Sequence, residues 1–225
     1  MLKRLLIDQT INMKLKLLSV AAGIALLAGS MEAKAQKVYK EGVITYTATS
    51  ARGSLDVKTS FRADSSVTVQ QSGPAKISII TAGKGDYLAI LVDVPVANLK
   101  KAALATPAEL EEGKSALPTL TFTPGTETKV IAGLNCKKVV VKDDKGATFD
   151  IWVTNDISAP TNGMSQLYDK VGGFPVQFTT YQMGQKVDVA FKSISDEKVP
   201  AGTFGIPAGF DKISLSDLKA LGGNR

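Results

Sequence analysis

Apolar and polar residues alternate with a period of two along most of the chain after Gln36, a pattern typical of half-buried β-strands. Ile44, Tyr46 and Ala48, for example, would share one face of a strand. Turn-forming sequences such as Ser72-Gly73-Pro74 separate these runs at intervals of about ten residues. Short strands at this spacing favour an antiparallel sandwich or a barrel-like sheet.

The remaining strands are predicted from the same pattern. Tyr87–Val92 is continuously apolar, which indicates a strand that is covered on both faces or lies centrally in its sheet. The others are indicated by alternating residues (Leu55, Val57, Thr59 and Phe61; Val67 and Val69; Ile77 and Ile79) and by the segments 119–123, 139–141, 149–154, 175–181 and 186–194.

Short helices are expected to interrupt the strands. Pro107–Glu112 is predicted to be helical, with Thr106 as its N-cap and Gly113 as its end. A second short helix is expected over residues 164–170, where the pair Gly172-Gly173 would stop it.

The end of the chain is predicted to form an amphipathic helix over residues 214–221, capped by Ser214 or Ser216. No internal repeat and no long linker divides the residues before it. We therefore expect a single β-rich domain over residues 36–213, followed by a short helix or tail at 214–225.

The first 35 residues are interpreted as a secretory signal peptide. Two lysines at 14 and 16 precede an apolar run from Leu17 to Ala28, and Ala33-Lys34-Ala35 matches the A-x-A cleavage rule. The run is shorter than the roughly 20 residues that a membrane-spanning helix needs. We expect cleavage between Ala35 and Gln36, with an uncleaved anchor as the alternative. Residues 1–12 are interpreted as an extension from an upstream start codon.

The product of this cleavage is expected to be periplasmic or secreted. Gln36, not a cysteine, stands directly after the cleavage site, so there is no residue to carry a lipid anchor there, and no later segment is apolar and long enough to predict a membrane span. Without residues 1–35 the chain carries 22 cations and 19 anions, a net charge of +3 instead of +6. The two signs are interspersed and aromatic residues are few, which argues against a nucleic-acid-binding surface.

The absence of histidine restricts the chemistry of this chain. It excludes Ser-His-Asp and Cys-His catalysis as well as histidine-ligated metals. The single cysteine, Cys136, cannot form an internal disulfide. We interpret it as a small buried apolar residue instead of a reactive thiol, with an intermolecular disulfide as the alternative.

Carboxylates are available, but the sequence pattern does not gather them. Asp150, Asp156 and Asp188 would serve calcium binding or acid–base catalysis only if the fold brought them together. Gly83-Lys84-Gly85 lacks the following helix of a phosphate-binding loop. We therefore predict a protein that is not an enzyme and has no cofactor or metal site.

The most distinctive segment is a predicted hairpin that carries the only cysteine and the only tryptophan. Asp144-Lys145-Gly146 fits a three-residue turn with Gly146 in the left-handed region. The apolar pattern then sets the register of the two strands. The predicted pairs are Asp143 with Ala147, Val141 with Phe149, Val139 with Ile151, and Lys137 with Val153.

The opposite face of this hairpin would carry Cys136, Lys138, Val140 and Trp152. Lys138 is expected to lie across from Trp152. There its stem or ammonium would cover the indole, or the two side chains would make an ordinary cross-strand contact.

This hairpin resembles the DUF4412 family, exported proteins of Bacteroidota with a domain of unknown function. The resemblance lies in Thr-Glu-Thr-Lys-Val-Ile-Ala-Gly-Leu-Asn-Cys-Lys-Lys at 126–138 and Ile-Trp-Val-Thr at 151–154. The cleavage context at 33–36 and Phe-Gly-Ile-Pro-Ala-Gly-Phe at 204–210 are also similar to that family. The signature positions are Glu127, Thr128, Lys129, Ile131, Gly133, Cys136, Trp152 and Thr154.

The resemblance implies a mainly β fold, in which a strongly curved antiparallel sheet carries two or three short helices. Such a sheet is similar to the half-barrels of the LolA/LppX lipoprotein-carrier group. The resemblance implies no catalytic residues.

Two classes of function remain open. The first is an exported, non-enzymatic envelope protein that binds a lipid or other hydrophobic ligand on a concave sheet face, with short helices as lids. Apolar residues on both faces of segments 87–92 and 139–141 favour it. The second is a structural or interaction protein of the envelope whose core is filled by its own side chains. The sequence does not identify which apolar residues would face a ligand.

Overall fold

The computed structural model describes residues 35–182 and 185–222, and most of them lie in one twelve-stranded sheet. The predicted signal peptide and start-codon extension fall in residues 1–34, outside the described residues. The strands of the sheet are β2 (Glu41–Ser50), β3 (Gly53–Arg62), β4 (Ser65–Ser72), β5 (Ala75–Ala82), β6 (Tyr87–Val94), β7 (Leu99–Leu104), β8 (Leu120–Ile131), β9 (Leu134–Asp143), β10 (Thr148–Thr154), β12 (Phe174–Gln182), β13 (Gln185–Ser195) and β14 (Asp211–Ser214).

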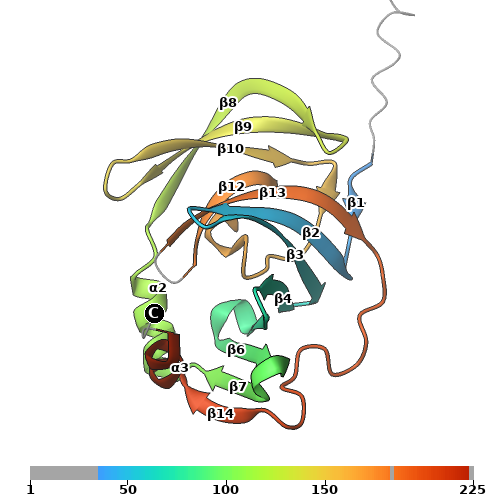
Figure 1. Cartoon of the computed structure of the whole chain (residues 1–225). Coiled ribbons are helices and arrows are strands. Elements are labelled where there is room, and N and C mark those ends of the chain that lie inside the picture. Colours follow the sequence, from blue (N-terminus) through green and yellow to red (C-terminus); the bar gives the residue numbers. More distant parts are fainter. Residues whose placement is uncertain (1–34, 183–184, 223–225) are drawn as a thin grey trace, which may run out of the picture. The chain divides into compact units, whose positions relative to one another are not determined.

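The strand order in the sheet is β14-β7-β6-β5-β4-β3-β2-β13-β12-β10-β9-β8 (Figure 1). The strands from β2 to β7 form a simple meander, in which each hairpin pairs with the next. The prediction of a mainly β fold with a large antiparallel sheet is confirmed. One pairing differs, because β14 joins β7 in parallel. A separate parallel pair links β1 (Lys37–Val38) to β11 (Ile157–Ser158).

The expected faces of β2 and β3 are confirmed. Ile44, Tyr46 and Ala48 are buried together, and Val57 and Phe61 are buried across from them. The interpretation of 87–92 is only half right. Alternate residues of β6 are buried, but Leu88, Ile90 and Val92 are half-exposed on its other face, and β6 lies third from the end of the sheet.

Three helical predictions have different outcomes. Helix α2 (Pro107–Ser115) begins as expected with Thr106 as its cap, and Glu109 completes a capping box. Gly113 does not end α2 but lies inside it. The helix expected over 164–170 is wrong, since only a single 3₁₀ turn, η3 (Gln166–Tyr168), forms there. The remaining helical elements are α3 (Leu215–Gly222), η1 (Gly83–Gly85) and η2 (Pro95–Ala97).

The cap of α3 settles the choice between the two serines. Ser214 Oγ accepts a hydrogen bond from the backbone N–H of Asp217 at 3.0 Å, and the Asp217 carboxylate accepts one from the Ser214 N–H at 3.2 Å. This reciprocal pair is the geometry of a capping box. Ser214 is therefore the N-cap, and Ser216 lies within the first turn.

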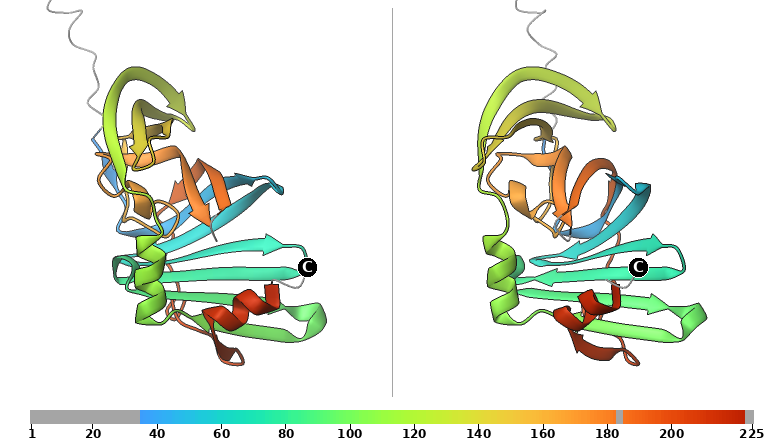
Figure 2. Two further views of the ribbon diagram at one scale, coloured as in Figure 1. Left: turned by 90° about the vertical axis from the view of Figure 1, so that its left-hand side faces the viewer. Right: turned by 60° about the vertical axis from the view of Figure 1, so that its left-hand side comes forward.

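The connection from β7 to β8 shows that the sheet bends. These strands are ten strand intervals apart in the sheet order, which corresponds to about 48 Å if the sheet were flat. The chain between them contains the nine-residue helix α2 and short extended ends, a path of less than about 40 Å. Figure 2 shows α2 passing along the side of the sheet between these two strands. A flat sheet could not accommodate this connection.

Two apolar clusters fill the interior. The first core lies on one face of the sheet, here called the inner face, which carries Ile44, Tyr46, Val57 and Phe61. The second core lies on the opposite, outer face of β4 to β7. There Val67, Ile80, Ala89, Leu91 and Ala102 are covered by Phe204, Ile206 and Phe210 from the connection between β13 and β14.

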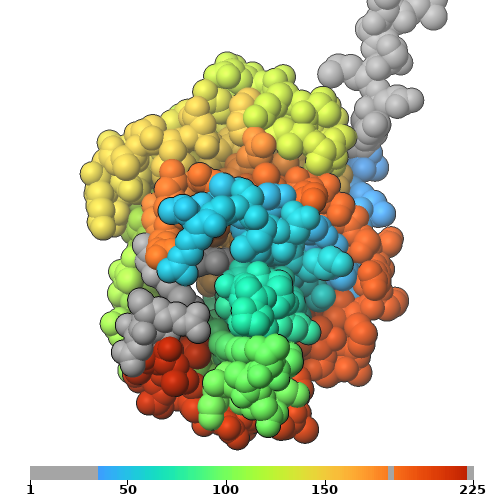
Figure 3. Space-filling view, viewed as in Figure 1, coloured from blue at the N-terminus to red at the C-terminus, as the bar shows by residue number. Residues whose placement is uncertain are grey.

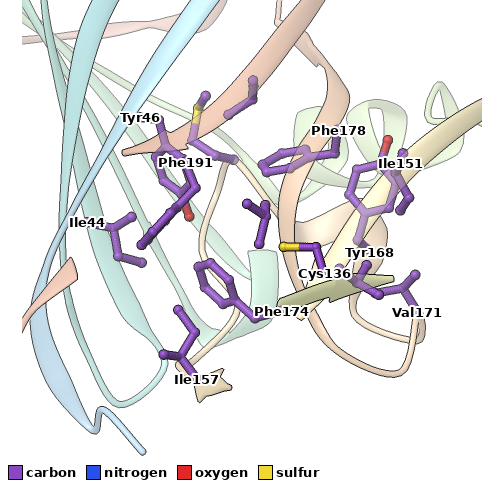
Figure 4. Packing of buried hydrophobic residues seen from close by; sticks show 14 of the residues in the cluster. Ile44, Tyr46, Cys136, Ile151, Ile157, Tyr168, Val171, Phe174, Phe178 and Phe191 are labelled. Atoms are coloured by element: carbon purple, nitrogen blue, oxygen red, sulfur yellow. The ribbon is translucent and has the colours of Figure 1, made fainter. Parts of the chain in front are cut away.

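Residues 155–173, here called the inner loop, complete the first core. Met164, Tyr168 and Val171 of this loop are buried in it, and the Tyr168 and Phe178 ring centroids are 5.2 Å apart (Figure 4). The Tyr168 hydroxyl donates to the Thr179 carbonyl of β12. This end of the inner face is therefore filled by the protein's own side chains.

Candidate functional site

The signature hairpin has the predicted register. Phe149 lies opposite Val141, Ile151 opposite Val139 and Val153 opposite Lys137. The turn also matches, because the Asp143 N–H donates to the Ala147 carbonyl at 3.0 Å and Gly146 has a φ of 87°. The side chain of Asp143 also stabilises the turn. Its carboxylate accepts hydrogen bonds from the backbone N–H groups of Lys145 and Ala147.

The polar face of this hairpin is organised differently from the prediction. Lys138 does lie opposite Trp152, but its ammonium is 2.7 Å from Glu127 and 2.8 Å from Asp150. These carboxylates raise the pKa of Lys138. The indole of Trp152 is covered instead by Lys129, whose ammonium is 4.1 Å from the ring centroid and also reaches Gln177. Hence Lys129 makes the cation–π contact.

Signature residues at the end of the hairpin stabilise its shape. Thr154 donates to the Asn135 carbonyl at 2.8 Å, and Gly133 has a positive φ of 78° in the two-residue turn between β8 and β9. Cys136 is 1% exposed, and burial raises the pKa of its thiol. A protonated, inaccessible thiol is a poor nucleophile, in keeping with the interpretation of Cys136 as a core residue.

The three carboxylates considered for catalysis or calcium binding lie apart. Asp150 pairs with Lys138, Asp156 accepts hydrogen bonds from Asn135, and Asp188 accepts one from Thr179. Each carboxylate is thus satisfied by a different neighbour. Within residues 35–182 and 185–222, no group of three or more acidic or cysteine side chains is placed to hold a metal ion.

A different surface has the chemistry of a binding site. On the inner face, Thr68 lies opposite Ile79, which in turn lies opposite Ile90. The same register places Ile77 beside Val92 and Thr81 beside Leu88. The side chains of this β5–β6 apolar patch are half-buried and belong to neither core: Ile77, Ile79, Leu88, Ile90 and Val92.

A row of hydroxyl groups separates the patch from the first core. Thr59 and Thr68 are buried and hydrogen-bonded at 2.9 Å, and Ser66 bonds to Thr81 at 2.8 Å. The inner loop reaches this row, where Gly163 N donates to Ser66 Oγ at 3.4 Å, and it also reaches the β5–β6 turn, where Gln166 donates to the Lys84 carbonyl at 3.0 Å. Within the β2–β7 meander, the side chains of the first core come from β2 and β3, and none comes from β4 to β7.

Helix α3 borders the patch on the inner side of the sheet, and an opening lies beside the patch. Helix α3 contacts β7 and β14, and Figures 1 and 2 place it on the side of the sheet opposite the 199–210 connection. The space-filling view shows a hollow between the β2–β3 hairpin (cyan) and β4–β5 (teal) (Figure 3). The patch thus combines branched apolar side chains with an adjacent opening, two features of sites for hydrophobic ligands.

Two pockets of the described residues lie away from the patch. One, of about 360 Å³, is lined by Gln36 and the polar side of the inner loop, including Thr161 and Asp169. The other, of about 550 Å³, lies over Tyr39, Glu41 and Arg62 and is widely open. Neither borders the β5–β6 apolar patch, and the mainly polar lining of the first does not suit an acyl chain.

The sequence pattern contained part of the signal for this patch. Ile77 and Ile79 were expected on one strand face, and the continuous apolar run 87–92 indicated apolar residues on both faces of its strand. The other apolar segment, 139–141, does not contribute, because Val139 and Val141 are buried in the first core. Only the packing in the tertiary structure distinguishes these two cases.

Comparison with known proteins agrees with the signature in the hairpin. A family model described as "Domain of unknown function (DUF4412)" matches residues 41–210. The chain belongs to the DUF4412 family. The match includes the signature hairpin, the inner loop and the β5–β6 apolar patch.

This DUF4412 protein was also compared with curated proteins and with solved structures. No curated protein matches the sequence. Among solved structures, a crystal structure of a DUF1329 family protein from Desulfovibrio piger ATCC 29098 is similar, with 10% sequence identity and a TM-score of 0.26. That similarity covers 74% of this chain and 90% of the other.

Proposed function

We propose that this DUF4412 protein is an exported, non-enzymatic protein of the cell envelope that binds a lipid or another hydrophobic ligand on the inner face of its sheet. The observation that carries the proposal is the β5–β6 apolar patch. Its side chains face the same side as the first core, yet they remain half-exposed beyond the hydroxyl row of Ser66 and Thr68. An apolar ligand would complete the coverage that the chain itself leaves unfinished.

An acyl chain or a similar elongated ligand suits this patch on energetic grounds. Each buried methylene group contributes about 0.8 kcal/mol, so about ten of them supply roughly 8 kcal/mol before the entropy cost of binding. Ile77 and Val92 lie side by side at one end of the patch, and Thr81 and Leu88 at the other. Hydroxyl groups at Thr68 and Thr81 would orient the polar end of such a ligand.

The export part of the proposal rests on the sequence of residues 13–36. A basic start, an apolar run and an A-x-A site before Gln36 are typical of a secretory signal. None of the helices in the described ranges has the length and hydropathy needed to cross a membrane. A periplasmic or secreted location would place the protein near lipids outside the cytoplasm.

The alternative function is that of a structural or interaction protein. It is favoured by the filled state of the first core, where Met164, Tyr168 and Val171 occupy the inner face of β2, β12 and β13. In that case the patch would be covered by a protein instead of a small ligand.

Ligand extraction and a binding assay distinguish the two functions. Protein purified from the envelope of its host is extracted with organic solvent and the extract is analysed by lipid mass spectrometry. Purified protein is also titrated with a fluorescent fatty acid. We expect Ile79→Asn and Ile90→Asn to weaken binding of the probe by about tenfold each, which is the effect of about 1.4 kcal/mol.

Gln71→Asp is the matched control, since Gln71 is exposed on β4 and lies on the outer face. It should leave probe binding unchanged. Circular dichroism melting checks that each variant is folded. Absence of bound lipid together with equal probe affinity in all variants would reject the ligand-binding function.

A further inference from the structure

The hairpin turns of the β2–β7 meander alternate between the two ends of the sheet. The turns at residues 51–52, 73–74 and 95–98 therefore share one end, here called the tip end. Figure 2 shows these three turns projecting on the same side of the sheet. The hollow in Figure 3 opens beside the first two of them. The tip end is thus the side from which a ligand would reach the β5–β6 apolar patch.

The longest of these turns exposes apolar side chains. Pro95, Val96 and Ala97 are all exposed, and Val96 is 84% accessible. Surface apolar residues that occur singly are normal. Here they are consecutive, and they project beyond the pair Val94–Leu99. These residues form an apolar protrusion at the end of a hairpin.

The protrusion is continuous with the proposed binding site. Along β6, Val92 and Val94 point to the same face as Ile90, because side chains alternate in a strand. Leu99 pairs with Val94 on β7. An apolar track therefore runs from the middle of the patch to the tip of the β6–β7 hairpin.

Positive charges surround the protrusion. Lys76 and Lys100 are both exposed and both lie across from Asp93, on the outer face of their strands. Arg52 is exposed in the β2–β3 turn, which lies at the same tip end beyond the 73–74 turn. None of these three cations has an ion pair within the described ranges, whereas Lys101 is neutralised by Asp211 at 2.8 Å. With Asp93 counted, these groups give the tip end as a whole a net charge of about +2.

We propose that the tip end docks on an anionic phospholipid surface, with Pro95–Ala97 inserted among the head groups and Arg52, Lys76 and Lys100 over them. An apolar tip flanked by cations matches the two components of such a surface, its acyl boundary and its negative head groups. The docked orientation would point the apolar track at the bilayer. This inference deepens the proposed ligand binding by naming its source as a membrane, but docking itself does not require a bound ligand.

Sedimentation with vesicles tests the inference. Purified protein is mixed with vesicles of phosphatidylcholine alone or of equimolar phosphatidylcholine and phosphatidylglycerol. We expect binding to the anionic vesicles that weakens as salt is added, because surface charges are screened. Val96→Asp should reduce the bound fraction about tenfold, and Lys76→Gln with Lys100→Gln should reduce it by a similar factor.

A matched substitution exists on the same protein. Val130 is 68% exposed beside the β8–β9 turn. This turn lies at the end of the sheet opposite the tip end, so Val130→Asp introduces the same charge far from the proposed docking surface. It should leave vesicle binding unchanged. Equal binding of Val96→Asp and Val130→Asp, equal binding to neutral vesicles, or no vesicle binding with capture of a protein partner by the tip end would each overturn the docking proposal.

The two proposals fail in distinguishable ways. Val96→Asp should keep its affinity for the fluorescent fatty acid, because Val96 lies outside the patch. Ile90→Asn should still sediment with anionic vesicles while it loses the probe. A protein that sediments normally but binds no probe would reject the ligand site and leave the docking surface standing.

Discussion

The side-chain amide of Asn162 donates a hydrogen bond to the hydroxyl of Tyr46 at 3.3 Å, and both residues are buried. This bond joins the inner loop to β2, the strand at the centre of the first core. Asn162 also accepts from the Met164 N–H at 3.0 Å. This side chain thus helps to hold the inner loop on the sheet, together with Tyr168 and Gly163.

Loss of this contact should destabilise the protein. Asn162→Ala removes two buried hydrogen bonds, so we expect a decrease of about 2 kcal/mol in the free energy of unfolding, measured by urea denaturation. Burial raises the pKa of the Tyr46 phenol, which therefore stays protonated and able to hydrogen-bond. Tyr46→Phe completes a double-mutant cycle. Strictly additive effects of the two substitutions would contradict a direct contact.

Alanine substitutions at two glycines should change the stability of the protein in opposite directions. A Cβ at Gly42 would lie 2.0 Å from the Ser195 carbonyl oxygen on β13, so Gly42→Ala should destabilise the sheet by about 3 kcal/mol. Gly113 lies inside α2 with no atom near its Cβ position, so Gly113→Ala should stabilise the protein by about 0.5–1 kcal/mol. Thermal melting of both variants checks the signs. A stable Gly42→Ala protein would mean that β2 and β13 do not approach this closely.

The carboxylate of Glu41 should make stability depend on pH. It pairs with Arg62 at 2.8 Å and accepts from the Val199 N–H at 2.7 Å, and these contacts lower the pKa of Glu41. A lowered pKa in the folded state means that the stabilisation is present above the ordinary glutamate pKa of about 4.3. It is lost as the pH falls below this value towards the folded-state pKa.

The matched variant for this prediction is Glu41→Gln, which keeps the shape of the side chain but cannot ionise. Urea denaturation between neutral pH and acidic pH should show a smaller loss of stability for Glu41→Gln than for the unmodified protein. Identical pH profiles would show that the ion pair does not contribute. Because Glu41 links β2 to the start of the connection that covers the second core, the variant also reports on that connection.

Local rules allowed much of the fold to be predicted. Side-chain alternation identified β2 and β3 with the correct buried faces, and turn chemistry set the register of the β9–β10 hairpin around Gly146. Both depend on neighbours within a few residues. The cap of α2 at Thr106 was predicted for the same reason, but Gly113 did not stop the helix, because glycine costs a helix only about 1 kcal/mol.

Predictions that depended on distant contacts were less successful. The segment 164–170 has helical composition, yet its backbone follows the inner face, where Tyr168 bonds to Thr179 and Asn162 to Tyr46. Lys138 faced Trp152 as expected, but Glu127, brought in by the bulge in β8, attracts its ammonium more strongly than an indole does. These outcomes depend on which side chains the sheet places together.

The amino-acid sequence by itself determined the β-rich class, the family signature and the absence of histidine chemistry, because alternation, turn residues and composition act over short stretches of chain. Only the tertiary structure decided which apolar faces are filled. Val139 is buried by the first core, whereas Ile79 and Ile90 remain half-exposed, although all three occupy similar apolar runs. The physical reason is that burial depends on what packs across the sheet: the buried side chains of the inner loop pack into the first core, which includes no residue of β5 or β6.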